Sequence, residues 1–487
     1  MNKTRTRFAP SPTGYMHIGN LRTALFEYLI AKHDGGDFLL RIEDTDQQRQ
    51  VEGAVDIIYD TMKMCGLQWD EGPDIGGDFG PYIQSERLPM YKGYAEKLIQ
   101  LKGAHYCFCK EEDIEAMRKE QGETFLFEDP CKRLSDQEIK EKLDAGQQYV
   151  IRQTIDHVET TSFDDEVYGH IEVESDILDE MVLIKSDGFP TYNFANIIDD
   201  HQMQISHVVR GNEYLSSTPK YNLIYDAYGW QRPVYVHVPP VMKDEQHKLS
   251  KRNGDASFQD LIAKGYLPEA VINYIALLGW SPESDQEIFT LQELIEQFDI
   301  RRISKRPAIF DIDKLTWMNS VYLREMDQKA YYDLVIPRLK EALHKDYDWH
   351  YIADLIRPRI NTLNDIAQLV DFLDSYDEQY DLELFRHKRQ KSTKESSLKV
   401  LEAMIEPLAG YEHWEDAQAL HEYLLSMPAQ MGVKNGVLLW PIRTALSGKK
   451  ATPGGATEIA YLLGKEECLR RIQIGIDRLK QVINEPA

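Results

Sequence analysis

The stretch Ala9-Pro10-Ser11-Pro12-Thr13-Gly14-Tyr15-Met16-His17-Ile18-Gly19-Asn20 joins a predicted strand over residues 4–9 to a predicted helix over residues 21–33. A second strand is predicted at 37–42 and a second helix at 51–65. This order predicts a doubly wound parallel sheet, in which ligands bind at the carboxyl ends of the strands. The turn before the first helix is the expected nucleotide site, because a helix N-terminus offers free N–H groups and a positive dipole end.

Beyond this sheet the pattern changes twice. Residues 101–187 are polar and rich in acidic side chains, and they read as an insertion. From about residue 255 the chain is almost wholly helical. Further strands are predicted at 191–194, 205–210 and 234–239, helices at 291–298, 330–343, 351–356, 398–409, 417–427 and 468–482, and a polar, basic linker at 386–397.

These patterns predict an α/β fold: a doubly wound, Rossmann-type domain with an α+β insertion, followed by all-α domains. The expected domains are residues 1–100 with 188–245 (doubly wound), 101–187 (inserted), 246–322 (the loop after the last strands and the segment that follows it), 323–390 and 391–487 (two helical subdomains).

Composition sets broad limits on location and partners. The chain has 487 residues, too many for one core, and its five cysteines show no disulfide framework, which favours a reducing, cytoplasmic setting. No stretch is apolar for the roughly 18 residues of a membrane helix. The net charge of −25 counts against a nucleic-acid partner unless the basic side chains are clustered. Basic runs do occur at 301–306 and 386–391, although either run alone reads equally well as solvated surface.

A second motif, Lys248-Leu249-Ser250-Lys251-Arg252, lies on a predicted loop after the last strands. Alone it reads as a solvated basic loop, and His17-Ile18-Gly19 alone reads as an ordinary turn. Together and in this order, the two motifs resemble those of class I aminoacyl-tRNA synthetases, His-Ile-Gly-His and Lys-Met-Ser-Lys-Ser. Asn20 departs from the first motif as the glutamate-specific branch does. The resemblance runs end to end, and the chain is identified as a member of the bacterial-type glutamyl-tRNA synthetases by these motifs together with residues 41–46, 190–195 and 265–270.

The resemblance implies that the enzyme activates L-glutamate with ATP and Mg²⁺ and transfers it to tRNA. The expected catalytic residues are His17, Gly19, Lys248 and Lys251. The expected ATP contacts are Ser11, Thr13, His17, Gly19, Glu213, Val241, Lys248, Ser250, Lys251 and Arg252. The expected glutamate contacts are Arg7, Ala9, Ser11, Glu43, Tyr192, Asn196 and Arg210.

The glutamate contacts match the charges of the ligand. Arg7 and Arg210 are expected to hold its carboxylates and Glu43 its ammonium. A cation facing the side-chain carboxylate rejects glutamine, because the neutral amide leaves a buried charge unpaired.

A cysteine group in the insertion raises the question of zinc. Cys107, Cys109 and Cys131 have a spacing at which many members of the family bind zinc. Those members add a Tyr or His near the last cysteine, where this chain has Phe127 and Arg133, which are not zinc ligands. His105 is an alternative donor, but free thiols packed in a small subdomain are the favoured interpretation.

The resemblance also assigns roles to the domains. It implies that residues 1–100 with 188–245 form the Rossmann-type catalytic domain, 101–187 the inserted acceptor-binding domain, and 246–322 the catalytic loop and stem-contact domain. The helical subdomains 323–390 and 391–487 are expected, by resemblance, to bind the anticodon region of a glutamate-accepting tRNA. The expected tRNA contacts are Arg301, Arg306, Arg357 and Arg359, with Lys434, Arg443, Lys449 and Lys450 as further basic candidates. Trp440 could stack on an unpaired base, but helix packing is the favoured interpretation.

Other functions stay open at this stage. A non-discriminating synthetase that also charges tRNA for glutamine would carry the same motifs. A truncated relative that glutamylates a tRNA base, or a small-molecule nucleotidyltransferase, would lack the long helical half. A non-catalytic tRNA-binding protein would not need His17, Lys248 and Lys251. A monomer is expected, and no partner protein is indicated.

Overall fold

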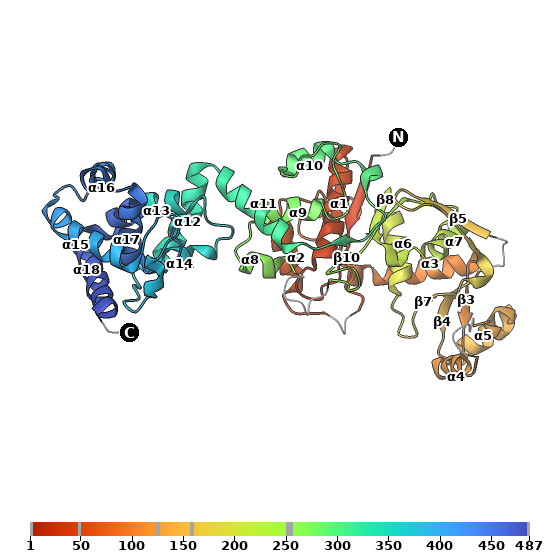
Figure 1. Cartoon of the computed structure of the whole chain (residues 1–487). Helices are drawn as coiled ribbons and strands as arrows, with labels where there is room; N and C mark the ends of the chain where they lie inside the picture. Colours follow the sequence, from red (N-terminus) through yellow and green to blue (C-terminus); the bar gives the residue numbers. More distant parts are fainter. Residues whose placement is uncertain (1–2, 47–49, 122–126, 156–159, 250–256, 485–487) are drawn as a thin grey trace. The chain divides into compact units, whose positions relative to one another are not determined.

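The computed structural model describes residues 3–46, 50–121, 127–155, 160–249 and 257–484 (Figure 1). The chain divides into two compact units, the first comprising residues 1–263 and 268–315 and the second comprising 264–267 and 316–487. Within the described residues, no helix has both the length and the apolar composition needed to cross a bilayer. The predicted change from an α/β half to a helical half is confirmed, whereas the finer domain bounds stay a prediction.

The first unit is built around β1 (Arg5–Phe8), β2 (Asp37–Leu40) and the helix between them, α1 (Ile18–His33). β1 and β2 run parallel, with Arg5 opposite Asp37 and Phe8 opposite Leu40. The middle of α1 is buried almost completely, including Leu21, Leu25 and Leu29, because the helix packs against strands and neighbouring helices. This parallel strand–helix–strand unit places the turn before α1 at the carboxyl end of β1.

A four-stranded sheet continues the unit in the order β6-β5-β9-β8. β8 and β9 are parallel, and β5 joins β9 in parallel through Asp165 opposite Tyr235. The backbone N–H of Ser206, just before β8, donates to the carbonyl of Arg5 in β1 at 2.9 Å, which links this sheet to β1. β5 and β6, which lie within the predicted insertion, therefore form part of the sheet that carries the site. The bounds are β5 (Thr160–Asp165), β6 (Gly169–Glu174), β8 (His207–Gly211) and β9 (Val234–Val238).

The rest of the insertion forms a smaller antiparallel sheet in the order β3-β4-β7, with short helices beside it. Its side chains join a core with α3, α6 and α7, which includes Tyr91, Leu183 and Phe194. The bounds are α3 (Leu88–Gln100), β3 (Ala104–Cys107), α4 (Glu111–Gln121), α5 (Asp136–Asp144), β4 (Val150–Gln153) and β7 (Val182–Ile184).

The strand predicted at 191–194 is wrong. Thr191 precedes the helix α6 (Tyr192–Gln202), in which Phe194, Ile197 and Ile198 are buried at helical spacing. The β-branched and aromatic residues at its start resemble a strand, but packing against α3, α7 and β7 selects the helix. The other helices and strands of the unit are α2 (Ala54–Met64), α7 (Thr218–Tyr228), β10 (Val241–Met242), α8 (Phe258–Ala263), α9 (Pro268–Ala276), α10 (Leu291–Gln297) and β11 (Ala308–Ile309).

The second unit is helical, and its tightest packing is between α15, α17 and α18. The linker predicted at 386–397 is wrong in its second half, because α15 begins at Lys394 after a Thr393 capping box. The helices are α12 (Gln328–Ala342), α13 (Trp349–Ile356), α14 (Asp365–Val370), α15 (Lys394–Gly410), α16 (Ala417–Gln430), α17 (Asn435–Ser447) and α18 (Ala456–Asn484), and α11 (Ile312–Glu325) precedes them.

Candidate functional site

The N-terminus of α1 carries the first motif. His17 is the N-cap, and its Nδ1 accepts the backbone N–H of Gly19 at 3.0 Å. The other ring nitrogen, Nε2, lies 3.1 Å from the carbonyl oxygen of Leu249 in the second motif. Because Nδ1 accepts, Nε2 carries the proton and donates to Leu249. The structure thus brings together two motifs more than 230 positions apart in the sequence.

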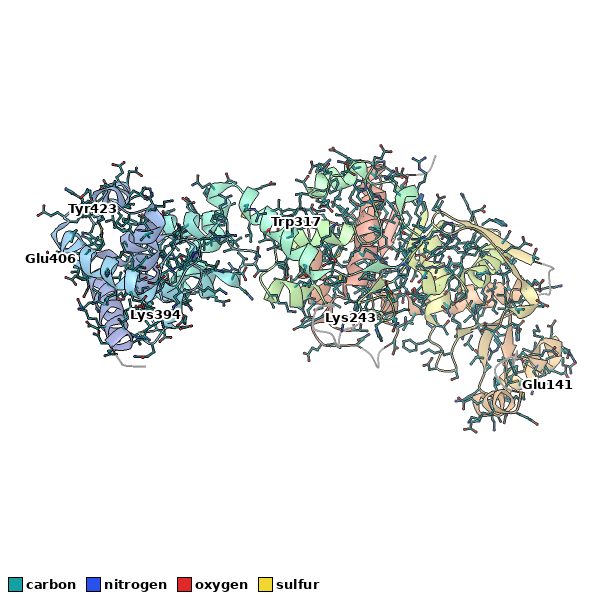
Figure 2. The ribbon with its side chains drawn as sticks, viewed as in Figure 1. Glu141, Lys243, Trp317, Lys394, Glu406 and Tyr423 are labelled. Carbon is teal, nitrogen blue, oxygen red and sulfur yellow. The ribbon has the colours of Figure 1, made fainter. Side chains whose placement is uncertain are left out.

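The second motif is described only as far as Leu249, so Ser250, Lys251 and Arg252 lie outside the described residues. Lys248 is exposed, and its backbone forms a bridge with Met242 of β10. The N–H of Leu249 donates to the carbonyl of Val241 at 3.2 Å, and Val241 is buried. Lys243 follows β10 just before this turn (Figure 2). Val241 and Lys248 therefore lie on one short hairpin, on the same side of the molecule as His17.

The predicted ATP contacts before α1 lie on the loop from 9 to 16. Ser11 and Thr13 are exposed, and the N–H of Thr13 donates to the carbonyl of Ser11 at 2.9 Å. Ala9 is half-buried at the end of β1. Glu213 is exposed after β8, and its carboxylate lies against the backbone of Gly211, where an added Cβ would meet it at 2.2 Å. The loop, β10 and the end of β8 thus present polar groups at the carboxyl ends of the strands.

A buried network of charges lies beneath this loop. Arg41 donates to Glu43 at 3.0 Å and pairs with Asp200 at 2.9 Å. Asp200 in turn accepts from Nε and Nη2 of Arg7 at 2.8 and 3.2 Å, and Arg7 Nη1 donates to Glu27 at 3.0 Å. All five side chains are at most 4% exposed. Glu43 and Arg7, predicted from the charges of one ligand, are therefore joined through Arg41 and Asp200.

Two carboxyls of this network, Glu43 and Glu27, have pKa values that burial raises. Burial raises the pKa of Glu43 to about 7, an effect that Arg41 and Arg7 oppose and Asp200 reinforces. Burial also raises the pKa of Tyr192, with a further increase from the charge of Glu43 and a decrease from Arg210. Tyr192 therefore lies within electrostatic reach of both predicted ligand-binding charges. Asn196, one turn further along α6, is buried and donates to the Tyr192 carbonyl at 2.8 Å.

Arg210 is buried at the end of β8 and has a different environment from Arg7. Its Nε donates to His237 at 3.2 Å and its Nη2 donates to Thr218 at 2.7 Å, so its direct hydrogen-bond partners are neutral. Its guanidinium carbon lies 4.8 Å from the ring centre of Tyr221 and 5.2 Å from that of Tyr214. Within the described part of the chain, no acceptor pairs with Nη1 of Arg210.

The cysteines of the insertion lie together. Sγ of Cys107, Cys109 and Cys131 and a carboxylate oxygen of Asp129 all lie within 4.8 Å of one another. Cys109 and Cys131 are 3.7 Å apart, far beyond the roughly 2.0 Å of a disulfide. The separation equals the spacing of about 3.8 Å between two sulfurs bound tetrahedrally to zinc at roughly 2.3 Å. Asp129 thus supplies a fourth donor, whereas the family resemblance places the fourth donor at the positions of Phe127 and Arg133.

Hydrogen bonds from neighbouring groups hold the members of this cluster in place. The backbone N–H of Phe108 donates to Sγ of Cys131 at 3.3 Å. Asp129 accepts from the N–H of Cys131 at 2.9 Å and contacts His105 at 3.0 Å. These are outer contacts of the kind that fix ligands of a metal. His105, considered as a donor from sequence, contacts Asp129 and is not a member of the cluster.

Comparison with known proteins decides the family. The family model for class I tRNA synthetases (E and Q), catalytic domain, matches residues 3–317. The chain belongs to this family. A model for an anticodon-binding domain matches residues 322–476.

Relatives of this synthetase match it over almost its whole length. Glutamate–tRNA ligases of Clostridium botulinum (strain Hall) and Clostridium tetani are 56% and 55% identical over 482 and 487 residues, covering 98–99% of this chain and 99% of each relative. Among solved structures, a glutamate tRNA ligase from Elizabethkingia meningosepticum in complex with its amino acid has a TM-score of 0.88 and 34% identity, covering 98% of this chain and 100% of that one. The predicted family and fold are confirmed.

The predicted tRNA contacts of the synthetase differ in their surroundings. Arg306 and Arg359 are exposed. Arg357 instead donates to the carbonyls of Leu323 and Met326 near the end of α11, so its guanidinium acts as a helix cap. Arg301 is exposed but is held by Asp299 in two contacts, at 3.0 and 2.8 Å. The contacts favour Arg306 and Arg359 as groups available to phosphate.

The further basic candidates also separate into two kinds. Lys434 and Lys450 are exposed, whereas Lys449 pairs with Asp371 at 2.8 Å. Arg443 is buried and lies 4.3 Å from the ring centre of Trp440. The indole N–H of Trp440 donates to the Leu384 carbonyl at 3.0 Å, in agreement with the predicted packing role.

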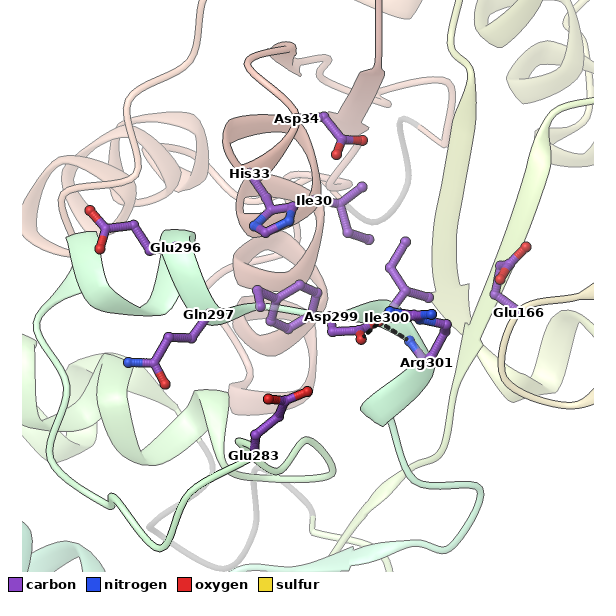
Figure 3. Close-up of a pocket in the computed structure, with 11 residues that line it drawn as sticks. Ile30, His33, Asp34, Glu166, Glu283, Glu296, Gln297, Asp299, Ile300 and Arg301 are labelled. Atoms are coloured by element: carbon purple, nitrogen blue, oxygen red, sulfur yellow. Dashed lines mark hydrogen bonds and ion pairs between the residues drawn. The ribbon is translucent and has the colours of Figure 1, made fainter.

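A cavity of about 580 Å³ lies at the opposite end of α1 from His17 (Figure 3). His33 and Asp34 border it at the end of α1, and Arg301 borders it beside its partner Asp299. Its other charged lining groups are the carboxylates of Glu166, Glu283 and Glu296. This acidic lining does not suit a triphosphate, which favours the shallow surface at the other end of α1 as the nucleotide site.

Several residues of the site could not be found from the sequence. Arg41 lies in a stretch that the family resemblance includes, but nothing in the pattern assigns it a role. Asp200, Asp165 and His237 carry no local signal, because the ionisable side chains that they contact lie 27 or more positions away. Asp129 lies only two positions before Cys131, but a single carboxylate there matches no zinc motif. The two motif residues His17 and Lys248 were found because the family defines them by sequence.

Proposed function

We propose that this synthetase is a glutamate–tRNA ligase that activates L-glutamate with ATP and transfers it to the 3′-terminal adenosine of tRNA(Glu). The observation that carries the proposal is the grouping of Glu43, Tyr192 and Arg210. The N–H of Glu43 donates at 3.0 Å to the carbonyl of Pro10, in the loop before His17, and the ring of Tyr214 lies 5.7 Å from that of Tyr192 and 5.2 Å from the guanidinium carbon of Arg210. These residues offer an anion for the ligand's ammonium and a cation for its side-chain carboxylate. The two Clostridium ligases that match the whole chain support the same assignment.

In the first step, an oxygen of the substrate α-carboxylate attacks the α-phosphorus of ATP. The new carboxyl–phosphorus bond forms as the bond to the leaving oxygen breaks, releasing pyrophosphate. His17 donates a hydrogen bond from Nε2, and its contact with Leu249 shows that this proton points toward the second motif. Lys248 and Lys251 supply positive charge to the phosphates. Mg²⁺ enters with the triphosphate as a further counter-charge.

In the second step, a terminal hydroxyl of the tRNA attacks the activated carboxyl, and AMP leaves. No enzyme nucleophile is required, so the residues act by holding the reactants and stabilising charge. Ser11, Ala9 and Asn196 complete the amino-acid pocket, and Arg7 holds the network beneath it while its three nitrogens donate to protein acceptors. Arg301, Arg306 and Arg359 remain proposed tRNA contacts, and the domain bounds given above remain proposals. Arg357 was also expected to contact tRNA, but we assign it to capping α11, because its guanidinium donates to the carbonyls of Leu323 and Met326.

The residues of the cysteine cluster fit a zinc ion. Cys107, Cys109, Asp129 and Cys131 would hold it, and a bound zinc would supply structural cross-linking of the β3 region with no part in the chemistry. The five described cysteines are unpaired, which supports a reducing, cytoplasmic location. The monomeric state is likewise part of the proposal.

The decisive experiment measures glutamate-dependent exchange of pyrophosphate into ATP, with tRNA present. Lys251→Ala should reduce exchange by more than about 100-fold, since it removes a charge that acts on the developing pyrophosphate. Exchange that survived this substitution unchanged would refute the mechanism.

A second assay distinguishes the two tRNA specificities. Purified tRNA(Glu) and tRNA(Gln) are charged in parallel with radiolabelled glutamate. Charging of tRNA(Glu) alone supports the proposed enzyme, whereas charging of both identifies the non-discriminating alternative. A tRNA-binding protein without catalysis would charge neither.

A further inference from the structure

Three neighbouring strands contribute one buried hydrogen-bonded series. Asp165 ends β5, His237 lies in β9 and Arg210 lies in β8. Oδ2 of Asp165 lies 2.7 Å from Nδ1 of His237, and Nε of Arg210 donates to Nε2 of His237 at 3.2 Å. The three residues are 3%, 0% and 6% exposed. The series connects the end of β5, which belongs to the predicted insertion, to the predicted glutamate pocket.

The hydrogen bonds fix the proton on His237. An arginine Nε can only donate, so Nε2 of His237 must be an acceptor without a proton. The ring proton is then on Nδ1, where the carboxylate of Asp165 accepts it. Burial lowers the pKa of His237 below its usual value, with Asp165 opposing this and Arg210 adding to it. The neutral ring with its proton on Nδ1 is therefore the form that Arg210 requires.

Asp165 is itself held firmly. Its Oδ1 accepts the backbone N–H groups of Val167 and Tyr168 at 2.9 and 2.8 Å, and its Oδ2 also accepts the N–H of His237 at 3.0 Å. The carboxylate has no freedom to turn away from the imidazole. The orientation of the His237 ring is thus set by backbone groups of the turn between β5 and β6 and of β9.

The same contacts determine which edge of Arg210 faces outward. Nε donates to His237 and Nη2 donates to Thr218. These two hydrogen bonds occupy the side edge of the guanidinium. Tyr214, Tyr221 and Tyr235 lie 4.8 to 5.5 Å from its carbon and restrict rotation of the plane. Within the residues that the structure describes, the remaining edge toward Nη1 has no protein acceptor. Through Nη1 and Nη2, that edge can offer a carboxylate two parallel N–H groups.

We propose that Asp165 and His237 are positioning residues that aim Arg210 at the side-chain carboxylate of the substrate and so help to set glutamate over glutamine. The inference rests on the proposed function. His237 holds Nε through a neutral acceptor, so it orients the guanidinium without neutralising the charge that the substrate carboxylate needs. A carboxylate in its place would pair with Arg210 and compete with the substrate.

A matched pair of substitutions separates positioning from folding. His237→Gln keeps an acceptor near the position of Nε2 and loses the bond to Asp165. His237→Asn keeps a donor near the position of Nδ1 and loses the bond to Arg210. His237→Asn also loses the 3.2 Å contact between Nε2 and the Thr218 hydroxyl. Each variant loses buried hydrogen bonding, so both should unfold at a somewhat lower temperature than the wild type. Only His237→Asn frees Arg210.

The assay is glutamate-dependent pyrophosphate exchange with tRNA present, with KM measured separately for glutamate and for ATP. His237→Asn should raise the KM for glutamate by about 10-fold or more, equivalent to at least one charge-assisted hydrogen bond, while His237→Gln stays within about 3-fold. The KM for ATP should stay within about 2-fold in both. The preference for glutamate over glutamine should fall only in His237→Asn.

Thr218→Val tests the other anchor of Arg210, since it removes the acceptor of Nη2 with little change in volume. It also removes the contacts of this hydroxyl with Nε2 of His237 at 3.2 Å and with the Tyr214 carbonyl at 2.8 Å. It should also raise the KM for glutamate and leave that for ATP unchanged. Equal changes in both KM values across the variants, or wild-type kinetics in His237→Asn and Thr218→Val, would overturn the inference. A wild-type protein without glutamate-dependent exchange would instead overturn the proposed function itself.

Discussion

Lowering the pH from about 8 to about 6 should weaken glutamate binding by about tenfold, because Glu43 must be ionised to hold the ligand's ammonium. Glu43 is 4% exposed, and burial raises its pKa to about 7. The charged groups that face it are Arg41, Arg7 and Asp200. The pKa of Asp200 is lowered and those of both arginines are raised by their charge partners, so none of them titrates in this range.

The magnitude follows from the fraction of Glu43 that is ionised. With a pKa of about 7, roughly nine-tenths of the carboxyl is ionised at about pH 8 and roughly one-tenth at about pH 6. If only the ionised form binds, the apparent affinity scales with this fraction, which amounts to about tenfold, or about 1.4 kcal/mol.

Protein stability should respond to Glu43 with the opposite sign. A carboxyl whose pKa is raised on folding binds its proton more tightly in the folded chain than in the unfolded chain. Its contribution to stability is therefore fully present below the unfolded pKa of about 4.5 and is lost as the pH rises through about 7. Ligand affinity increases over the same range, so the effect of Glu43 on binding and its effect on stability have opposite pH dependence.

The assay measures the KM for glutamate at saturating ATP, in pyrophosphate exchange with tRNA present, across this pH range. Glu43→Gln is the control, since it is similar in size and cannot ionise, and its KM should be high and independent of pH. The KM for ATP, followed in the same series, reports on His17 and the phosphate site. A wild-type KM for glutamate that changes by less than about 2-fold, or an equal slope in Glu43→Gln, would refute the reasoning.

Two further predictions concern the cysteine cluster and the RNA-binding half. Asp129→Ala should reduce tightly bound zinc from about one per chain to well below one, as measured by atomic emission on purified protein. Asp136 is exposed on α5, so Asp136→Ala should leave the zinc content unchanged. A metal-free wild type would contradict the assignment. Arg359→Ala should lower tRNA charging at least about 3-fold, with pyrophosphate exchange unchanged at saturating tRNA. Arg357→Ala should mainly lower the unfolding temperature, because it leaves the carbonyls near the end of α11 uncapped. Equal effects of the two substitutions on charging would argue against these different roles.

The local order of the fold was predictable because it depends on short-range patterns. The strand, turn and helix around His17 follow from apolar spacing and from Pro and Gly at the turn, and the structure confirms them. The error at 191–194 arose where local preference and tertiary packing disagree, since Thr191 and Tyr192 favour strands while Phe194 packs as part of a helix. The pairing of β5 with β9 has no sequence signal, because it joins segments about 70 positions apart.

The site was predictable where one ligand demands a set of charges. Glu43 and Arg210 follow from the ammonium and carboxylate of glutamate, together with the family motifs. Their supports do not follow, because Asp200 is 193 positions from Arg7 and Asp165 is 72 positions from His237. Side chains that act on other side chains carry no pattern of their own, and only the assembled sheet shows them.

The two arginines that the sequence treats alike have opposite electrostatic surroundings. Arg7 is paired directly with Asp200 and Glu27, so its charge is balanced by the protein. The direct partners of Arg210 are a neutral imidazole and a hydroxyl, with the carboxylate of Asp165 held one ring further away. A buried cation without a direct anionic partner costs free energy until a carboxylate arrives. In the proposed function, a glutamate side chain at Arg210 would relieve that cost and a glutamine side chain would not. We therefore expect selectivity for the acid to follow from the absence of a protein carboxylate among the described contacts of Arg210.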